Sequence, residues 1–360
     1  MINLGQTSKR KIEHLRICAK EDVESSPTGF EDIMLIHNAL PEISKDEIDL
    51  STTFLGKRFN APIMIAPMTG GHPDTKAINA ALGGAAEALG IGIGVGSQRA
   101  AIEDAKQVDS FRIVREVAPN AFVCANIGAP QLREYEISDV EKAIEMVDAD
   151  ALSIHLNFLQ EAIQPEGDVD ARGCLDAIKE ICRSVNVPVI VKETGAGISK
   201  EVATTLKRAG VSAIDVGGLG GTSWAGVEAY RARAEGNTLA EHLGKMFWNW
   251  GIPTAISIVE SSVDMPIIAT GGVRTGIDMT KCLALGASLC GVALPLVAPA
   301  LKGKKEVIDK LNVMIEELRV AMFLTGCRSI HDAQKAKVVI TGMTREILEQ
   351  RGHSLGRFSR

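Results

Sequence analysis

Residues 121–155, AFVCANIGAPQLREYEISDVEKAIEMVDADALSIH, contain two short apolar runs separated by one amphipathic stretch. The runs 121–126 and 151–155 have the length and apolar character of buried parallel strands. The stretch 138–148 between them is typical of a helix, and Ser138 stands where a capping side chain would begin it. The segment therefore predicts strand, helix and strand, the repeating unit of parallel α/β folds.

The same alternation extends outward in both directions along the chain. Further strand-like runs lie at 62–66, 90–95, 187–192, 212–216, 265–270 and 288–293. Helix-like sequence lies at 79–89, 173–184, 200–209 after Ser199, and 278–285. Eight strands in one strand-then-helix rhythm predict a (β/α)8, or TIM, barrel. A doubly wound open sheet is the alternative architecture.

Polar and glycine-rich motifs follow the strand ends, and they favour the barrel. In chain order these motifs are MTGG, GSQR, NIGAP, HLNFLQE, KETGAG, GGLGGTS, GGVRTG and ALP. A barrel gathers such motifs at one mouth, on its C-terminal face, whereas an open sheet spreads them along an edge.

The remaining segments flank or interrupt this barrel. Residues 1–61 form a predicted N-terminal extension with one helix, and 305–324 and 344–350 are predicted C-terminal helices. The segment 220–258 holds all three tryptophans and is predicted to be a helical insertion over the mouth. Because no repeat or linker is visible, we expect a single domain over residues 1–360.

Composition excludes several classes of protein. The 360 residues are 46% hydrophobic and 23% charged, which is typical of globular proteins and not of disordered ones. We expect no membrane span and no secretory signal, since no charge-free apolar run reaches about 18 residues and the first residues lack an apolar core. The net charge of −6 disfavours a general nucleic-acid binder. Seven scattered cysteines without a CxxC motif indicate reduced thiols and a cytoplasmic location.

The glycines of GGVRTG, residues 271–276, indicate a phosphate site after the seventh strand. Gly271 and Gly272 would let backbone N–H groups approach an anion, and Arg274 would add a charged donor. The motif GVALP at 291–295 ends the eighth strand, and in many barrels these two loops bind phosphate together. A tight turn without a ligand is the alternative.

A second candidate site is a platform for a heteroaromatic ring. Lys192 ends the apolar run VPVIVK and is expected at the rim, facing an anionic part of a cofactor or acting as a Schiff-base amine. An ion pair with Glu193 is the simpler alternative. Neutral donors and acceptors recur after other strands, although singly each is typical of a turn: Ala66, Pro67, Met68, Thr69, Ser97, Asn126 and Thr222.

The motif HLNFLQE after the fourth strand carries further chemistry. His155 and Asn157 share one face if the strand continues, and Gln160 and Glu161 follow on the next turn. A lone carboxylate can hold Mg²⁺ that takes its other ligands from water and substrate phosphates. The alternatives are a dipole-compensating Glu161 at a helix start and a structural His155.

A basic helical face near residue 10 predicts an anion site. Arg10, Lys11 and His14 fall together opposite the apolar residues Ile12 and Leu15. Arg99 of the GSQR loop would add a further positive charge. A solvated basic face is the alternative.

These motifs occur together in one known family. The chain resembles the type 2 isopentenyl diphosphate isomerases, FMN-dependent (β/α)8 enzymes, over about residues 6–351. The resemblance rests on RKxEH, FEDIxLxHxALPE at 30–42, APMTGG, GSQR, HLNxxQE, KETGAG, GGLGGTSW and GGVRTG. Residues 353–360 carry no match.

The resemblance implies interconversion of isopentenyl and dimethylallyl diphosphate by a 1,3-proton shift in isoprenoid biosynthesis, with reduced FMN as acid/base catalyst. Gln160, His155 and Lys192 are the implied catalytic residues, and Glu161 the ligand of Mg²⁺. FMN would be held by Ala66, Pro67, Met68, Thr69, Ser97, Asn126, Lys192 and Thr222, and its phosphate by Gly271, Gly272, Arg274, Ala293 and Leu294. The substrate would contact Arg10, Lys11, Ser97, Gln98, Arg99, His155, Asn157 and Gln160.

The resemblance also implies NADPH as the reductant and a homotetramer or homo-octamer. Either the flavin or a side chain could donate the proton. A 2-hydroxy-acid oxidase would need a His–Arg pair after the seventh or eighth strand, and a nucleotide dehydrogenase a cysteine after the sixth. The sequence has neither there. A flavin-storage or anion-binding barrel would leave HLNxxQE unexplained.

Overall fold

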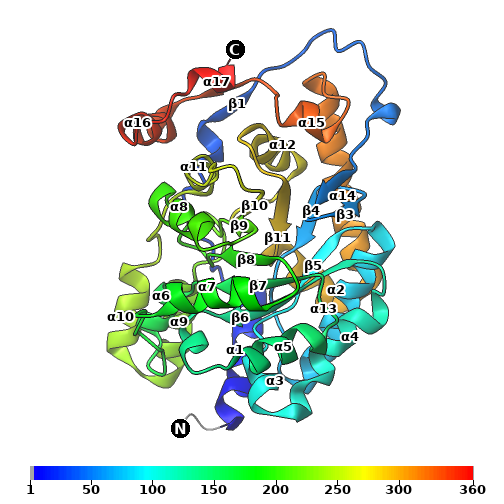
Figure 1. The fold of residues 1–360 in the computed structure, drawn as a ribbon. Helices are drawn as coiled ribbons and strands as arrows, with labels where there is room; N and C mark the ends of the chain where they lie inside the picture. The colour runs from blue at the N-terminus through cyan, green and yellow to red at the C-terminus, as the bar shows by residue number, and fades with distance from the viewer. Residues whose placement is uncertain (1–3, 360) are drawn as a thin grey trace.

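Eight parallel strands close a barrel in the computed structural model, which describes the backbone of residues 4–359 and side chains from residue 10 onward (Figure 1). The strand order around the barrel is β10-β11-β4-β5-β6-β7-β8-β9. The strands are β4 (Ile63–Ile65), β5 (Gly92–Gly94), β6 (Phe122–Gly128), β7 (Ala151–His155), β8 (Val189–Lys192), β9 (Ala213–Asp215), β10 (Ile267–Thr270) and β11 (Leu289–Val292). The prediction of a TIM barrel is confirmed, because every apolar run overlaps one barrel strand and the sheet has no open edge.

Helices cover the outside of the barrel between successive strands (Figure 1). They are α2 (Lys76–Leu89), α4 (Asp109–Val117), α5 (Ile137–Met146), α7 (Cys174–Ser184), α8 (Lys200–Arg208), α11 (Thr254–Glu260), α12 (Gly276–Ala284) and α14 (Lys304–Leu324). Ser199, which precedes the predicted helix 200–209, caps α8 by accepting from the backbone N–H of Val202. The predicted cap Ser138 is wrong, because Glu136 and Asp139 form a capping box that begins α5 one residue earlier.

A hairpin closes the N-terminal end of the barrel. It consists of β2 (Thr52–Phe54) and β3 (Lys57–Phe59), and its residues Phe54 and Phe59 pack edge-on and tilted against Phe122 of β6. Gly92 of β5 makes room for this cluster, since a Cβ there would lie 2.7 Å from the ring of Phe59. Aromatic side chains therefore fill this end of the barrel.

The rest of the extension and the C-terminal segment lie beside each other outside the barrel. Strand β1 (Ile33–Leu35) pairs antiparallel with β12 (Val338–Ile340). Helices α15 (Ile330–Ala333), α16 (Gly342–Gln350) and α17 (Gly356–Ser359) complete this layer. Short 3-10 helices occur at Phe30–Asp32, Lys45–Glu47, Pro73–Thr75, Ala105–Gln107, Pro130–Arg133 and Leu294–Leu296.

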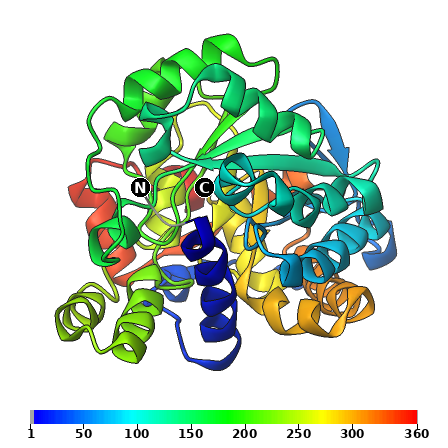
Figure 2. The same cartoon turned by 90° about the horizontal axis from the view of Figure 1, so that it is seen from below.

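Helix α1 (Leu4–Lys20) lies at the opposite, C-terminal mouth (Figure 2). It contacts α3 (Arg99–Glu103), α9 (Trp224–Glu235) and α13 (Val297–Lys302). Helix α6 (Phe158–Ile163) follows β7 and packs against α9. These helices place charged and polar side chains around the strand ends.

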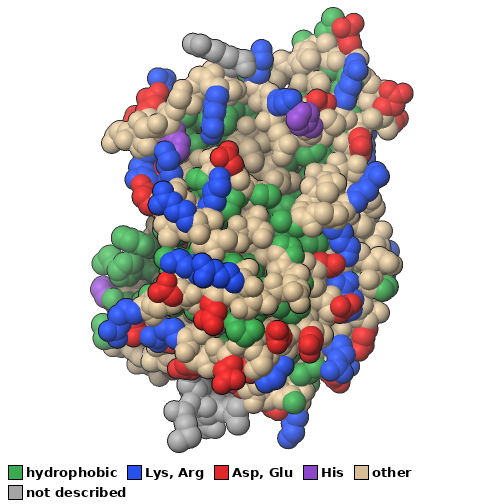
Figure 3. All heavy atoms as spheres, viewed as in Figure 1, with side chains coloured by type: hydrophobic (Ala, Val, Ile, Leu, Met, Phe, Trp, Pro, Cys, Tyr) green, Lys and Arg blue, Asp and Glu red, His purple; other side chains and the backbone are tan. Residues whose placement is uncertain are grey.

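The expected insertion 220–258 divides into two parts. Helix α9 and its partner α10 (Thr238–Met246) pack together beside the mouth, whereas α11 packs against α8 and β10 in the outer ring. Figure 3 shows charged side chains of both signs interspersed over one face, with apolar side chains gathered at the level of α10. Leu239, Met246 and Trp250 are exposed there.

No helix among the described residues is long and apolar enough to cross a membrane. All seven cysteines are free thiols.

Candidate active site

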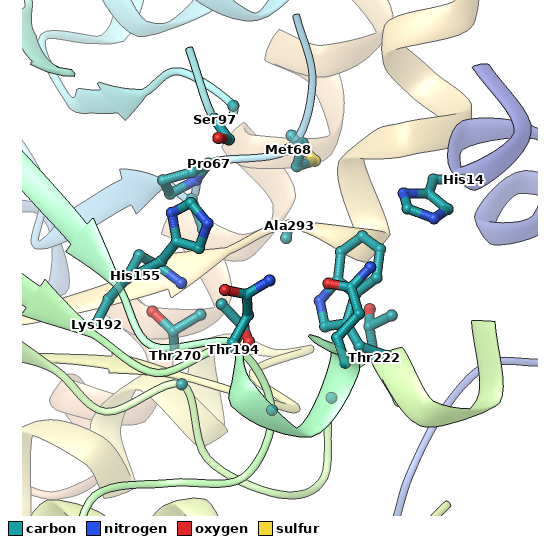
Figure 4. A pocket seen from close by; sticks show the side chains of 18 of the residues that line it. His14, Pro67, Met68, Ser97, His155, Lys192, Thr194, Thr222, Thr270 and Ala293 are labelled. Atoms are coloured by element: carbon teal, nitrogen blue, oxygen red, sulfur yellow. The ribbon is translucent and has the colours of Figure 1, made fainter. Parts of the chain in front are cut away.

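A cavity opens at the C-terminal mouth, where the strand-end motifs meet (Figure 4). Its empty volume is about 1520 Å³, counting the part that opens to solvent. His155 and Lys192 lie on one side of the view and His14 on the other, with Pro67, Met68 and Ser97 along a third wall. The cavity is large enough for a flavin and a small second ligand.

Most of the predicted site residues line this cavity. They are Arg10, Lys11, Ala66, Pro67, Met68, Ser97, Arg99, Asn126, His155, Asn157, Gln160, Glu161, Lys192, Thr222, Gly271, Gly272, Arg274, Ala293 and Leu294. Residues from α1 to the end of β11 thus converge on one space.

Two predicted residues do not line it. Gln98 is fully buried, and its amide donates to the carbonyl of Ala143 and accepts from the backbone N–H of Asn126. Thr69 is also buried. Gln98 contacts the backbone of the cavity residue Asn126, and neither the Gln98 nor the Thr69 side chain lines the cavity.

The protonation of His155 follows from its neighbours. Its Nδ1 lies 2.9 Å from Oδ1 of Asn126, whose Nδ2 donates to the carbonyl of Val95. The Asn126 amide is thereby oriented, and Nδ1 of His155 carries the proton. Burial, together with the charges of Lys192 and Lys11, lowers the pKa of His155 to about 3. His155 is therefore neutral and has Nε2 as an acceptor.

Lys192 ends β8 as predicted and is buried at the rim of the cavity. Its Nζ donates to the carbonyl oxygen of Glu193 at 2.8 Å. The Glu193 carboxylate instead accepts from the backbone N–H groups of Thr194, Gly195 and Ala196. The described contacts therefore do not include the predicted alternative of a Lys192–Glu193 ion pair. Lys192 also stands beside the buried Asp215 in the barrel, and burial raises the pKa of that carboxyl.

Three cations converge at the α1 side of the cavity. Burial and the charges of Arg10 and Arg99 lower the pKa of Lys11 to about 8. Arg99 pairs with Glu103 at 2.7 Å, and Arg10 contacts Glu166 at 3.4 Å. Three cations that line one cavity, with Lys11 buried between the charges of Arg10 and Arg99, indicate a site for an anionic group.

Glu161 retains one free acceptor position. Its Oε1 accepts from Asn157 at 3.0 Å, and its Oε2 accepts from Gln164 at 2.6 Å and from the backbone N–H of Asp168 at 2.8 Å. A carboxylate has about four lone-pair sites, so one remains on Oε1. The described residues contain no group of three or more His, Cys, Asp or Glu side chains suited to a metal. The free position on Glu161 Oε1 fits a cation that takes its other ligands from water and substrate.

A buried network that the sequence did not predict orients Gln160. Glu228 of α9 accepts from Gln160 at 2.8 Å, lies 3.0 Å from Nε2 of His14, and accepts from Arg231 at 2.7 Å. Burial opposes ionisation of Glu228, but these donors lower its pKa to about 2. Trp224 packs against His14 at a ring distance of 5.2 Å. The only sequence signal was the Glu228–Arg231 spacing within the tryptophan-containing insertion, because His14 lies 214 residues from Glu228.

The GGVRTG loop supports an anion site by a route different from the predicted one. A Cβ on Gly271 would lie 2.2 Å from the carbonyl of Gly218, so close backbone packing alone requires this glycine. Backbone N–H groups at the start of α12 are already bound, since Asp278 accepts from Arg274 and Thr275. Arg274 nevertheless keeps a buried Nη2 that has no hydrogen-bond partner among the described residues. This spare charged donor fits a phosphate.

Comparison with known proteins defines the class first. The FMN-dependent dehydrogenase family matches residues 8–143 and 143–340. A putative lactate oxidase of Pediococcus acidilactici has a similar structure, with a TM-score of 0.63, 18% identity and 95% of both chains covered. A mandelate oxidase with benzoyl-formic acid gives a TM-score of 0.58 at 18% identity, covering 94% of this chain and 97% of that one. These likenesses show the fold, and with the family match they define a barrel of the FMN-dependent dehydrogenase class.

The sequences of curated relatives identify the family within this class. Isopentenyl-diphosphate delta-isomerase of Methanosarcina barkeri is 63% identical over 354 residues, which cover 98% of this chain and 97% of that protein. The proteins of the same name from Archaeoglobus fulgidus and Halobacterium salinarum are 56% and 52% identical, covering 96% and 97% of this chain and 99% and 98% of theirs. The chain belongs to the isopentenyl-diphosphate delta-isomerase family, of the FMN-dependent type.

Proposed function

We propose that this protein interconverts isopentenyl and dimethylallyl diphosphate by a 1,3-proton shift in isoprenoid biosynthesis, with reduced FMN as the acid/base cofactor. One observation carries the proposal: a single cavity brings the uncharged side chains of His155 and Gln160 together with the cations Arg10, Lys11 and Arg99. A substrate with an uncharged hydrocarbon group and an anionic tail is complementary to this arrangement. The names of the curated relatives support the same reaction.

The residues present fit FMN. Bound in reduced form, it would supply the group that donates and accepts protons at the alkene. Lys192 would stabilise negative charge on the reduced ring, because it is a buried cation at the rim. The walls would come from Ala66, Pro67, Met68, Ser97, Asn126 and Thr222, and the phosphate would lie near Gly271, Gly272, Arg274, Ala293 and Leu294.

His155 and Gln160 would complete the reacting end. Neutral His155 can accept a hydrogen bond at Nε2 without placing a charge beside the hydrocarbon. Gln160 is held by Glu228 through its Nε2, which leaves its Oε1 as the atom to face a ligand. Both would hold the alkene group and restrict the access of water.

The diphosphate would be bound by Arg10, Lys11, Ser97, Arg99 and Asn157. Glu161 would hold Mg²⁺ through the open position on its Oε1, and the ion would supply positive charge to the diphosphate. The family resemblance further supports NADPH as the reductant and a homotetramer or homo-octamer. The free cysteines support a cytoplasmic location.

The experiment compares two reactions of the FMN-loaded protein. Under anaerobic, reducing conditions with Mg²⁺, isopentenyl diphosphate should be converted to dimethylallyl diphosphate. The structural likeness to hydroxy-acid oxidases makes oxygen-dependent oxidation of lactate or mandelate the competing activity. Oxygen consumption with a hydroxy acid, without isomerisation, would contradict the proposal. Gln160→Ala should lower kcat while FMN remains bound.

A further inference from the structure

Gln164 joins the two polar parts of the proposed diphosphate site. Its Nε2 donates to Oε2 of Glu161 at 2.6 Å, and its Oε1 accepts from Nη1 of Arg10 at 3.3 Å. The side chain is 5% exposed and lines the cavity. One amide thus contacts a carboxylate with its donor and a guanidinium with its acceptor, which fixes its orientation.

The contact with Glu161 determines which carboxylate oxygen is available. Oε2 accepts two hydrogen bonds, from Gln164 and from the backbone of Asp168, and these occupy its lone pairs. Oε1 accepts one, from Asn157. Gln164 therefore keeps Glu161 turned so that Oε1 presents the open position to a cation.

The contact with Gln164 orients Arg10 but leaves most of its guanidinium N–H groups available. Nη1 of Arg10 lies 3.3 Å from Gln164 and 3.4 Å from Glu166, both long for charge-assisted bonds. Glu166 lies nearer to Arg231, at 2.9 Å, so its charge is compensated chiefly by that residue. Both contacts use Nη1, so Arg10 can keep them while its other N–H groups bind a phosphate.

We propose that Gln164 is a positioning residue that couples cation binding at Glu161 to anion binding at Arg10. This inference rests on the proposed function and deepens it. A cation that stiffens Glu161 also holds the Gln164 amide, and through it Arg10, in the orientation that a diphosphate requires. By linkage, each ligand should then strengthen the binding of the other by the same factor.

The test uses the full-length, FMN-loaded protein and inorganic pyrophosphate as the probe. Calorimetry gives the pyrophosphate Kd with and without Mg²⁺, and the ratio measures the coupling. Gln164→Met keeps the length of the side chain but removes both polar atoms. The Mg²⁺ enhancement should fall by about tenfold or more, as is typical when a residue behind a metal ligand is lost, with FMN affinity and Tm unchanged.

Gln107→Met is the matched control, because Gln107 also donates to a carboxylate, Asp104, but does not line the cavity. It should leave the enhancement as in the wild type. If Gln164→Met fails to bind FMN, Gln164→Asn replaces it as the test variant. Its side chain is one methylene shorter, and the same loss of Mg²⁺ enhancement is expected. A variant enhancement within about twofold of wild type would overturn the inference. Absence of pyrophosphate binding by the wild type would instead contradict the proposed function.

Discussion

The two ends of the barrel are built from the same eight strands but have opposite properties. At the N-terminal end, Phe54, Phe59 and Phe122 fill the opening with aromatic contacts. At the C-terminal mouth, strands end in polar residues such as His155, Lys192 and Asp215, which are buried yet line or adjoin a cavity. The comparison indicates that one end stabilises the barrel, whereas the other accepts buried polar groups that a ligand can satisfy.

The largest expected effect is a loss of stability on mutation of the N-terminal end of the barrel, which the phenylalanines fill. Phe59→Ala removes a side chain that is 1% exposed and should lower the free energy of unfolding by about 3–5 kcal/mol. Turnover per FMN-loaded molecule should be unchanged. Urea unfolding and active-site titration measure the two quantities. A large loss of kcat in the folded fraction would show that the N-terminal end contributes to catalysis as well as to stability.

Lys192→Ala tests the role of the C-terminal mouth in catalysis. We expect kcat to fall by about 10²–10³-fold, as when one preorganised charge donor is removed from an active site, and FMN binding to weaken. The free energy of unfolding should change little, because the variant removes a buried charge rather than packing. Lys200→Ala, an exposed lysine at the start of α8, is the control. Near-normal rates in Lys192→Ala would make Lys192 structural.

Glu161→Gln separates the metal site from the flavin site. The Mg²⁺ concentration for half-maximal activity should rise by about 10–100-fold, because a neutral amide oxygen replaces the only carboxylate proposed to bind the cation. FMN affinity, measured by flavin fluorescence, should stay constant. Glu180→Gln on the exposed face of α7 should alter neither. Unchanged metal dependence in Glu161→Gln would remove this residue from the metal site.

The smallest expected effect is the pH dependence of anion binding. The pKa of Lys11 is lowered to about 8, so Lys11 is charged below that pH and neutral above it. The contribution of Lys11 to pyrophosphate binding should therefore be fully present below pH 8 and lost above it. The affinity should fall by about tenfold as the pH rises, because one charged hydrogen bond is lost. Lys11→Arg should abolish this dependence up to pH 10. An identical pH profile in both proteins would assign the titration to another group.

The sequence predicted the barrel because buried parallel strands are short, apolar and regularly spaced. It could not decide which of several neighbouring polar residues caps a helix. Glu136 and Asp139 form the capping box of α5, so Ser138 does not cap it. Nor could it fix the direction of a side chain within a loop. Gln98 and Ser97 are adjacent, yet Gln98 points into the protein and Ser97 lines the cavity.

Contacts between distant segments were also beyond sequence reasoning. His14 and Glu228 meet only because α1 packs on α9, and Gln164 contacts Arg10 across 154 residues. Sequence patterns indicated that each helix carried polar residues. Only the folded arrangement shows which of them are buried partners.

The most direct test of the account is solvent isotope incorporation at the open end of the barrel. The FMN-loaded, reduced protein is incubated anaerobically with isopentenyl diphosphate and Mg²⁺ in D2O, and the products are analysed by mass spectrometry. The account predicts dimethylallyl diphosphate that carries solvent deuterium. A colourless protein that takes up no FMN, or a flavoprotein that returns the substrate unlabelled and unchanged, would contradict it.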